Sequence, residues 1–190
     1  MLHLGLRGSE LSKRVENLLD SVQLPRSMRN RYPHELSGGQ RQRVCIAGAI
    51  VLAPDVIVAD EPVASLDVSI RNDILKLMVS HKETLGVTYL FITHDLSLAW
   101  VISDRIAVMY LGRIVEIGPT AAVLSDPRHP YTRALLSVIP VPNPRRRRER
   151  TILAGETPNP IDPPAGCRFR PRCPVAFDRC SEQDPELRSV

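Results

Sequence analysis

Apolar residues recur at helical spacing in two stretches of the chain, residues 9–20 and residues 68–85. The apolar positions are Leu11, Val15, Leu18 and Leu19 in the first stretch, and Ile70, Ile74, Leu77, Met78 and Leu85 in the second. A stripe with this period is typical of an amphipathic helix that packs against a core. We therefore predict two helices, the second of them ended by Gly86 as its C-cap.

Continuous apolar runs lie around the second helix. Residues 56–59 read Val-Ile-Val-Ala and predict a buried strand, and residues 87–92 predict another strand. A helix is predicted from Gly39 up to Pro54, which ends it. This helix is polar at its start and almost wholly apolar later, so we expect its second half, including Cys45, to be buried.

The elements predicted after residue 94 are shorter. A short helix is predicted over residues 95–102, followed by a hairpin of residues 105–110 and 113–117 around Leu111-Gly112. We expect Thr120 to N-cap a short helix and residues 130–139 to form another. The strand–helix–strand order over residues 56–110 indicates an α/β domain with a largely parallel sheet.

Composition changes after residue 139. Prolines surround the arginine tract of residues 145–150, so we expect an extended arm over residues 140–166. This predicts two parts, residues 1–139 and residues 140–190. The chain has 190 residues and a net charge of +4, with no run of apolar residues long enough to span a membrane and no signal peptide. A reducing cytosol is the expected compartment.

Polar residues follow both predicted strands of the parallel pair. Asp60 and Glu61 come directly after the first strand, and His94 follows the second. Open α/β sheets bind ligands beyond the carboxyl ends of their strands. A carboxylate there can hold Mg²⁺, and a second one can polarise an attacking water. Taken singly, the acid pair also fits a solvated turn, the histidine a structural role, and Ser-Leu-Asp67 an ordinary N-cap.

Four segments occur in a fixed order: ELSGGQRQRV from Glu35, VIVADEP from Val56, SLD ending at Asp67, and FITHD ending at Asp95. Together they closely resemble the signature, Walker B strand, D-loop and switch-histidine loop of ABC transporter nucleotide-binding domains. The resemblance implies a partial domain of that α/β type, an ATPase that uses ATP and Mg²⁺.

The same resemblance assigns roles by position. Asp60 would hold Mg²⁺, Glu61 would be the general base, and His94 would contact the γ-phosphate. The signature residues would cap the γ-phosphate of an ATP bound mainly to a partner domain, and Asp67 would lie at the dimer seam. The signature residues are Ser37, Gly38, Gly39 and Gln40.

Further segments resemble the oligopeptide/dipeptide importer subfamily. They are YLFITHDLS, SDRIAVMYLGRIVEIGPT, HPYTRALLS and the tail IDPPAGCRFRPRCP. The resemblance implies a second ABC ATPase subunit, two membrane permease subunits and, indirectly, a peptide-binding protein as partners. It implies a peripheral location at the cytoplasmic face of a bacterial membrane, with peptides, nickel or another small solute as cargo. For the arginine tract, a solvated linker, anionic lipid or nucleic acid stays open, although no nucleic-acid partner is expected.

The phosphate-binding loop G-x-x-x-x-G-K-S/T of this family is absent from the sequence. We therefore expect an N-terminally truncated domain with negligible ATPase activity of its own. One alternative is a non-hydrolysing half-site that lends its signature to a full-length partner. A non-transport ABC ATPase of translation or DNA repair is disfavoured, because no second cassette or coiled coil is present.

Three cysteines, Cys167, Cys173 and Cys180, lie in the arm with spacing that does not fit a zinc ribbon. Thiolates on an irregular segment suit a soft metal or an iron–sulfur cluster. Relatives in the resembled subfamily can carry a 4Fe–4S cluster here, but the usual fourth cysteine would lie beyond Leu187, and the given sequence stops at Val190. The ligand set is therefore expected to be incomplete, and three metal-free thiols are the alternative.

Overall fold

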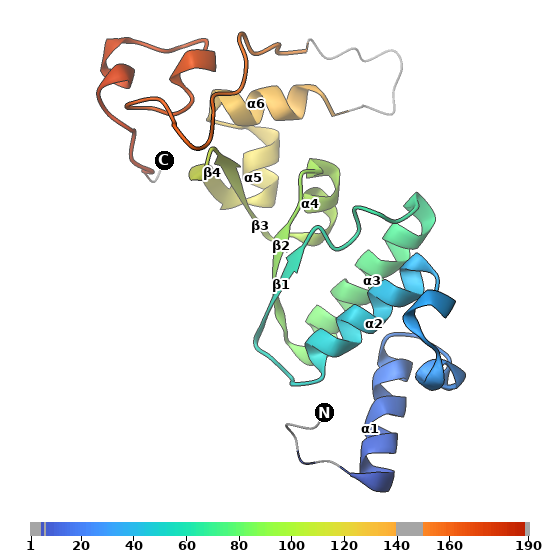
Figure 1. The fold of residues 1–190 in the computed structure, drawn as a ribbon. Helices are drawn as coiled ribbons and strands as arrows, with labels where there is room; N and C mark the ends of the chain where they lie inside the picture. Colours follow the sequence, from blue (N-terminus) through green and yellow to red (C-terminus); the bar gives the residue numbers. More distant parts are fainter. Residues whose placement is uncertain (1–4, 6, 140–149, 189–190) are drawn as a thin grey trace. The chain divides into compact units, whose positions relative to one another are not determined.

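The computed structural model describes residue 5 and residues 7–139 and 150–188. They form two compact units, one up to His94 and one from Asp95 onward, which are described separately (Figure 1). The division at residue 139 inferred from composition stays a prediction. Most of the arginine tract, residues 145–148, lies outside the described residues.

The first unit contains three α-helices, two short 3-10 turns and two strands among its described residues. In chain order they are α1 Gly8–Ser21, η2 Arg26–Asn30, η3 Pro33–Glu35, α2 Gly38–Ile50, β1 Val56–Asp60, α3 Val68–Leu85 and β2 Thr88–Ile92. The predicted helices α1 and α3 are confirmed. Gly86 has a φ of +67° and ends α3 as predicted.

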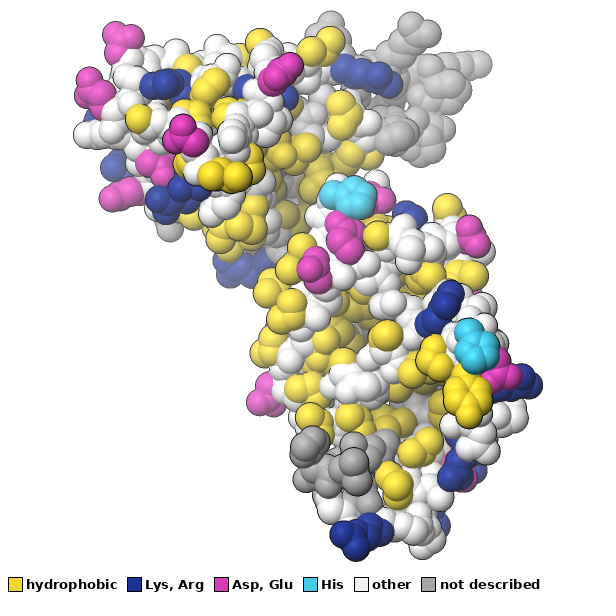
Figure 2. Space-filling view, viewed as in Figure 1, with side chains coloured by type: hydrophobic (Ala, Val, Ile, Leu, Met, Phe, Trp, Pro, Cys, Tyr) yellow, Lys and Arg dark blue, Asp and Glu magenta, His cyan; other side chains and the backbone are white. Residues whose placement is uncertain are grey.

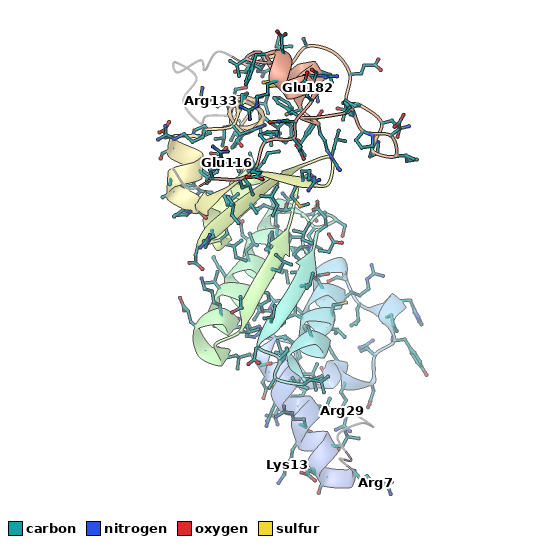
Figure 3. All side chains as sticks on the ribbon, turned by 90° about the vertical axis from the view of Figure 1, so that its left-hand side faces the viewer. Arg7, Lys13, Arg29, Glu116, Arg133 and Glu182 are labelled. Atoms are coloured by element: carbon teal, nitrogen blue, oxygen red, sulfur yellow. The ribbon has the colours of Figure 1, made fainter. Side chains whose placement is uncertain are left out.

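Strands β1 and β2 pair in parallel, in register from Val56 with Thr88 to Asp60 with Ile92. Helices α2 and α3 lie on one face of the pair, and in Figure 3 the opposite face is toward the viewer. On that face Val58 is 62% exposed and Leu90 is 56% exposed. Figure 2 shows hydrophobic side chains at the surface along this side of the unit. The prediction that β1 is fully buried is therefore wrong: only the helix-covered face loses contact with water.

Helix α2 buries one side rather than its whole second half. Ile46 and Ile50 are buried, while Val44 is 43% exposed and Cys45 is also exposed. Residues four apart share a helix face, and Cys45 is turned away from the face that Ile46 and Ile50 form. The expectation that Cys45 lies in the core is wrong, because among the described residues of this unit nothing covers that side of α2.

The core of the first unit joins helix α3 to the C-terminal end of α1. Its α3 members are Ile74, Leu75, Leu77 and Met78, all at most 3% exposed. Val22 and Leu24, just after α1, are also buried. His81 on α3 is buried and its Nε2 lies 3.0 Å from the Ser21 carbonyl oxygen. This contact satisfies one orphan carbonyl at the end of α1.

The second unit is built on an antiparallel hairpin. Its elements are α4 Leu96–Ile102, β3 Arg105–Tyr110, β4 Arg113–Pro119, α5 Thr120–Ser125, α6 Pro130–Ser137, η4 Arg170–Arg172 and η5 Asp178–Ser181. Leu111 and Gly112 connect the strands with φ values of 45° and 75°, as a primed hairpin turn requires. The predicted hairpin is confirmed. Within the described residues β3 pairs with β4 alone, so the parallel sheet predicted over residues 56–110 is limited to β1 and β2.

Thr120 does not cap a helix as predicted. It is the first residue of α5, and its hydroxyl donates to the Ser103 carbonyl oxygen at 2.8 Å. The hydroxyl is thereby engaged by the end of α4 instead of by the first turn of α5. Ile106 and Val108 of β3 pack with Val123 of α5 to form the core of this hairpin layer.

The arm beyond residue 150 has no α-helix or strand among its described residues, yet it is anchored. Phe169 is only 1% exposed, and its ring packs against Tyr110 and His129, each at a centroid distance of 5.1 Å. Tyr131 lies at 5.7 Å from the same ring. Aromatic pairs at these separations stabilise a fold beyond the area that they bury.

Two side chains accept hydrogen bonds from the backbone N–H groups at the start of helix α6. The buried Glu116 carboxylate of β4, labelled in Figure 3, accepts from the backbone N–H of Arg128 at 2.7 Å and of His129 at 3.0 Å. His129 is the N-cap residue, and its Nδ1 accepts from the Tyr131 N–H at 3.1 Å. Nδ1 can accept only in the neutral imidazole. Burial lowers the pKa of His129, which favours this neutral form, although the nearby Glu116 opposes the shift.

We predict that Gly39→Ala destabilises the first unit more than Gly38→Ala. A Cβ at residue 39 would lie 2.5 Å from Ile70 Cγ2, whereas one at residue 38 would lie 3.5 Å from Leu66 Cδ2, an ordinary contact. Overpacking costs about 1–3 kcal/mol, against a gain of up to about 1 kcal/mol in helix propensity. Urea unfolding measures the free energy of unfolding of both single variants. The double variant Gly39→Ala with Ile70→Ala is measured in the same way, because it removes the side chain that the new Cβ would meet. Equal stabilities of the two single variants would contradict the tight contact.

We predict that acid weakens the second unit through His129. Its pKa is lowered in the folded chain and about 6.5 in the unfolded chain, so the unfolded state binds the proton more readily. Stability is therefore full above about pH 6.5 and falls as the pH drops from there toward the lowered value. His129→Asn keeps a capping acceptor without titrating, so its unfolding midpoint should fall less between pH 7.5 and 5. Parallel acid profiles of the two proteins would contradict this.

Candidate functional site

Glu61 occupies a strained position at the end of β1. Its φ is +46°, in the left-handed region that non-glycine residues seldom adopt. The backbone is held there by its N–H, which donates to the Ile92 carbonyl oxygen at the end of β2 at 3.0 Å. Strained residues persist only where their surroundings over-determine them. The parallel strand pair thus fixes the point at which the Glu61 side chain leaves the sheet.

The Glu61 carboxylate contacts His94, which follows β2. His94 Nδ1 lies 2.6 Å from Glu61 Oε1, and the His94 backbone N–H donates to the same oxygen at 3.1 Å. The His94 side chain is 80% exposed and that of Glu61 is 37% exposed. The two residues are therefore joined to each other and open to solvent, as a pair acting on an incoming ligand must be. Their catalytic roles stay predictions.

Asp60 lies at the last position of β1, and its side chain is exposed. It shares the uncovered face of the sheet with Val56 and Val58, because alternate residues of a strand point the same way. Among the described residues its carboxylate has no hydrogen-bond or ion-pair partner. A free carboxylate beside the Glu61–His94 pair fits Mg²⁺, which takes one or two carboxylates and keeps several waters.

The predicted signature residues form the start of helix α2. Ser37 is the N-cap, and its Oγ accepts from the Gln40 N–H at 3.3 Å, while Gln40 Oε1 accepts from the Ser37 N–H at 2.9 Å. This is a reciprocal capping box. It engages two of the backbone N–H groups, and among the described residues those of Gly38 and Gly39 have no acceptor. The anion-binding capacity of the signature therefore rests on these two glycine N–H groups.

Contacts with α3 explain the two glycines. Gly39 faces Ile70 so closely that a side chain would not fit, and Gly38 faces Leu66. Leu66 immediately precedes Asp67, which is the N-cap residue of α3 but makes no side-chain capping bond. The signature and the Asp67 turn are thus packed together within this unit, and the Asp67 carboxylate remains exposed.

Two contributors were missed by sequence reasoning. The Glu35 carboxylate accepts from the Tyr32 N–H at 2.7 Å and from Arg31 Nη1 at 3.1 Å, and these hydrogen bonds lower its pKa. It closes the 3-10 turn that leads into the signature, a pattern that the Tyr-Pro-His-Glu order could have indicated. Ile70, predicted only as a core position, is the residue that excludes a side chain at Gly39.

The arm cysteines do not assemble a metal site. The Cys167 N–H donates to the Cys180 carbonyl oxygen at 2.9 Å, whereas the Cys173 N–H donates within its own turn, to Arg170. Among the described residues no group of three histidine, cysteine or acidic side chains is placed to hold a metal ion. Burial raises the pKa of the Cys167 thiol, which opposes the thiolate that a metal needs. The predicted iron–sulfur cluster is therefore not supported by the described residues.

None of the helices in the described part of the chain is both long and apolar enough to cross a bilayer.

Curated relatives match almost the whole chain. A Brucella ovis protein whose name describes an ATP-binding protein for peptide import is 52% identical over 96% of this chain and 57% of its own length. A dipeptide transport ATP-binding protein of Haemophilus influenzae is 50% identical over 96% of this chain and 56% of its own length. The chain thus spans somewhat more than half of the curated relatives that it matches.

Solved structures agree on the fold. The protein cbiO1 of Clostridium perfringens, part of an ABC transporter complex, is 36% identical with a TM-score of 0.58, over 64% of this chain and 48% of that one. An ATP-binding cassette of an ABC transporter, MJ1267 in its ADP conformation, is 30% identical with a TM-score of 0.59, over 68% and 51%. The predicted α/β fold of an ABC nucleotide-binding domain is thereby confirmed.

Two family models match different parts of the chain. Residues 3–64 match the ABC transporter family, and residues 115–180 match the oligopeptide/dipeptide transporter, C-terminal region. The first match contains the signature and the acid pair, and the second contains most of the hairpin strand β4, helix α6 and the arm cysteines. Residues 3–64 therefore belong to the ABC transporter family, and residues 115–180 belong to the C-terminal region of the oligopeptide/dipeptide transporter family.

Proposed function

We propose that this chain is part of the ATP-binding subunit of a bacterial ABC importer for peptides, in which ATP binding and hydrolysis drive uptake. The observation that most directly supports this proposal is the 2.6 Å distance between Glu61 Oε1 and His94 Nδ1, at the carboxyl ends of two parallel strands. The names of the relatives, which describe peptide import and dipeptide transport, support peptides as the cargo.

In this proposal Glu61 accepts the proton of a water that attacks the γ-phosphate. Glu61 Oε1 accepts from the His94 backbone N–H and also contacts His94 Nδ1, and these two contacts hold that oxygen in place. The other carboxylate oxygen, Oε2, is therefore the one that can accept a proton from the water. The exposed His94 ring can turn its Nε2 to a phosphate oxygen. Asp60 would hold Mg²⁺, which when bound neutralises charge on the phosphates.

The signature acts on the same phosphate from another side. The Gly38 and Gly39 N–H groups lie at the positive end of the α2 dipole, where an anion is favoured. Because Ser37 and Gln40 already cap each other, the turn is preorganised and need not rearrange when ATP arrives. The ATP is proposed to be held mainly by a second ABC ATPase subunit, with Asp67 at the seam between the two.

Two membrane permease subunits and a peptide-binding protein complete the proposed assembly, with the chain at the cytoplasmic face of the membrane. Selection of the cargo is assigned to those partners, because every proposed site residue is assigned to nucleotide, Mg²⁺ or water. Nucleic acid has no place in this scheme.

A half-site function is the second candidate. The sequence contains no G-x-x-x-x-G-K-S/T, the loop that cradles ATP phosphates. Its signature, by contrast, is complete and capped. In this reading the chain lends its Gly38 and Gly39 N–H groups to ATP on a full-length partner and hydrolyses nothing with Glu61.

We predict negligible ATP hydrolysis by the purified 190-residue chain alone, because nothing in the sequence supplies the lysine and backbone cradle of a phosphate-binding loop. A phosphate-release assay with and without Mg²⁺ measures this. Turnover that disappears in Glu61→Gln would overturn the prediction, since it would show a complete site in the isolated chain.

We predict that the chain raises the ATPase rate of a partner subunit that carries the phosphate-binding loop. Ser37→Ala removes the acceptor that caps the start of α2, so the Gly38 and Gly39 N–H groups are less well preorganised. The stimulation should fall by at least about tenfold, which is less than the roughly 10²–10³-fold cost of losing a preorganised donor outright. Ser80→Ala, a serine exposed on α3 away from the signature, is the matched control and should retain it. Circular dichroism of both variants checks that α2 is still formed.

The Glu61→Gln variant separates the two candidates in the same mixture. If stimulation survives this change, the chain acts as a half-site; if it falls, Glu61 takes part in hydrolysis as the leading proposal requires. Absence of any stimulation by the unmodified chain, with a partner that hydrolyses ATP by itself, would contradict the half-site function.

A further inference from the structure

We propose that Tyr32 and His34 form an aromatic contact for the nucleoside end of the ATP that the partner subunit holds, with the adenine base lying against their exposed ring faces. This contact rests on the function proposed above and deepens it. It gives the chain a part in how tightly ATP is held, in addition to the two glycine N–H groups that face the γ-phosphate.

The two rings are stacked on each other and exposed to solvent. Their centroids lie 5.7 Å apart and their planes differ by 7°, which is a separation typical of offset-stacked rings. Tyr32 is 67% exposed, and His34 is exposed as well. The other ring contacts among the described residues lie in the second unit, around the buried Phe169. A stacked pair that stays in water contributes little to a core, so its flat outer faces are available to a ligand.

Hydrogen bonds fix the turn that carries the rings. The Tyr32 N–H donates to Glu35 Oε2 at 2.7 Å, and the Glu35 N–H donates to the Tyr32 carbonyl oxygen at 2.9 Å. Arg31 Nη1 holds the other oxygen of the Glu35 carboxylate at 3.1 Å. Pro33, between the two rings, has its φ angle fixed by its own side chain. The rings are therefore placed before a nucleotide arrives, which lowers the entropy lost on binding.

The rings flank the end of α2 at which the signature N–H groups emerge. Only Leu36 separates the turn η3 from Ser37, the N-cap residue of α2. His34 is three residues from Ser37, a stretch of chain that spans at most about 10 Å. The triphosphate and ribose of ATP together have a similar length. A nucleotide with its γ-phosphate at the Gly38 and Gly39 N–H groups can therefore extend its base to the rings.

The surroundings of the rings favour a nucleotide over a protein surface. The residues on either side of the turn, Arg31 and Glu35, are charged and exposed, whereas the centre of a protein interface is depleted of charge. Their ion pair at 3.1 Å also leaves no uncompensated carboxylate beside the rings to repel a triphosphate. Nucleobases stack on exposed aromatic side chains whatever their sequence, because every base has a π-face. The other face of the base is left to the partner subunit.

A contact with the nucleoside end acts on binding and not on the chemical step. The base takes no part in the transfer of the γ-phosphate, so the rings hold ATP equally well before and during the reaction. An interaction of this kind lowers KM and leaves kcat unchanged. The Gly38 and Gly39 N–H groups, by contrast, face the reacting phosphate. The effects of a substitution on KM and on kcat therefore separate the rings from the signature.

The first test mixes the 190-residue chain with a partner subunit that carries the phosphate-binding loop, and measures the stimulated ATPase rate against ATP concentration. The double variant Tyr32→Ala with His34→Ala should raise KM for ATP by at least about fivefold, the low end of what base stacking contributes. The rate at saturating ATP should stay the same. Circular dichroism checks that the variant is folded.

Two controls accompany this variant. Tyr32→Phe with His34→Phe keeps two rings and should restore the KM, because stacking needs only the ring face. Phe177→Ala removes a ring of the arm that is 66% exposed, and it should leave KM unchanged. A rise in KM with the two phenylalanines as large as with the two alanines would contradict stacking.

The second test locates the base directly. An ATP analogue with a photoreactive azide on the adenine ring is irradiated with the same mixture, and the chain is then digested for mass spectrometry. The expected label lies on the peptide that contains Tyr32 and His34 and disappears with excess ATP. Labelling confined to the partner subunit would overturn the proposal.

The outcomes also separate this proposal from the function on which it rests. Absence of stimulation by the unmodified chain would overturn both. Stimulation with an unchanged KM in the double-alanine variant would overturn the ring contact alone. A lower rate at every ATP concentration with KM unchanged would assign the rings to contact with the partner protein, and would likewise overturn the nucleotide contact.

Discussion

Parallel pairing of β1 with β2 is the constraint on which the candidate site depends. The register that sets Asp60 opposite Ile92 also places the residues that follow each strand side by side. Glu61 enters a left-handed backbone conformation because its N–H is tied to the Ile92 carbonyl oxygen. From there its carboxylate meets both the backbone and the ring of His94. A shift of one residue in this register would separate the pair.

The second half of the site depends on packing between helices. The signature at the start of α2 is shaped by its own capping box and by Ile70 on α3, which leaves no room for a side chain at Gly39. The same α3 begins at Asp67. One helix contact therefore fixes the positions of the Gly38 and Gly39 N–H groups and of the exposed acid at the neighbouring turn.

The unit from Asp95 onward is held together by other interactions. A hairpin, two short helices and an arm without regular structure share an aromatic cluster around Phe169, and a buried carboxylate, Glu116, starts the helix beside it. An irregular segment can hold a defined conformation in this way, since a few buried rings and charge-assisted hydrogen bonds replace a continuous backbone ladder.

Local sequence determined the identity and order of the elements and the chemistry at the strand ends. Apolar periodicity predicted α1 and α3, and apolar runs predicted the two parallel strands and the hairpin, because these patterns reflect short-range geometry. The resemblance of the motifs to the ABC family selected Glu61, His94 and the signature. Only the tertiary structure decided which faces of the helices and strands are buried and which residues contact one another. It left Cys45 and one face of β1 exposed, turned the Thr120 hydroxyl to Ser103, and identified Ile70 as the neighbour of Gly39. Burial and partnership arise from segments far apart in the chain, which no single window of the sequence contains.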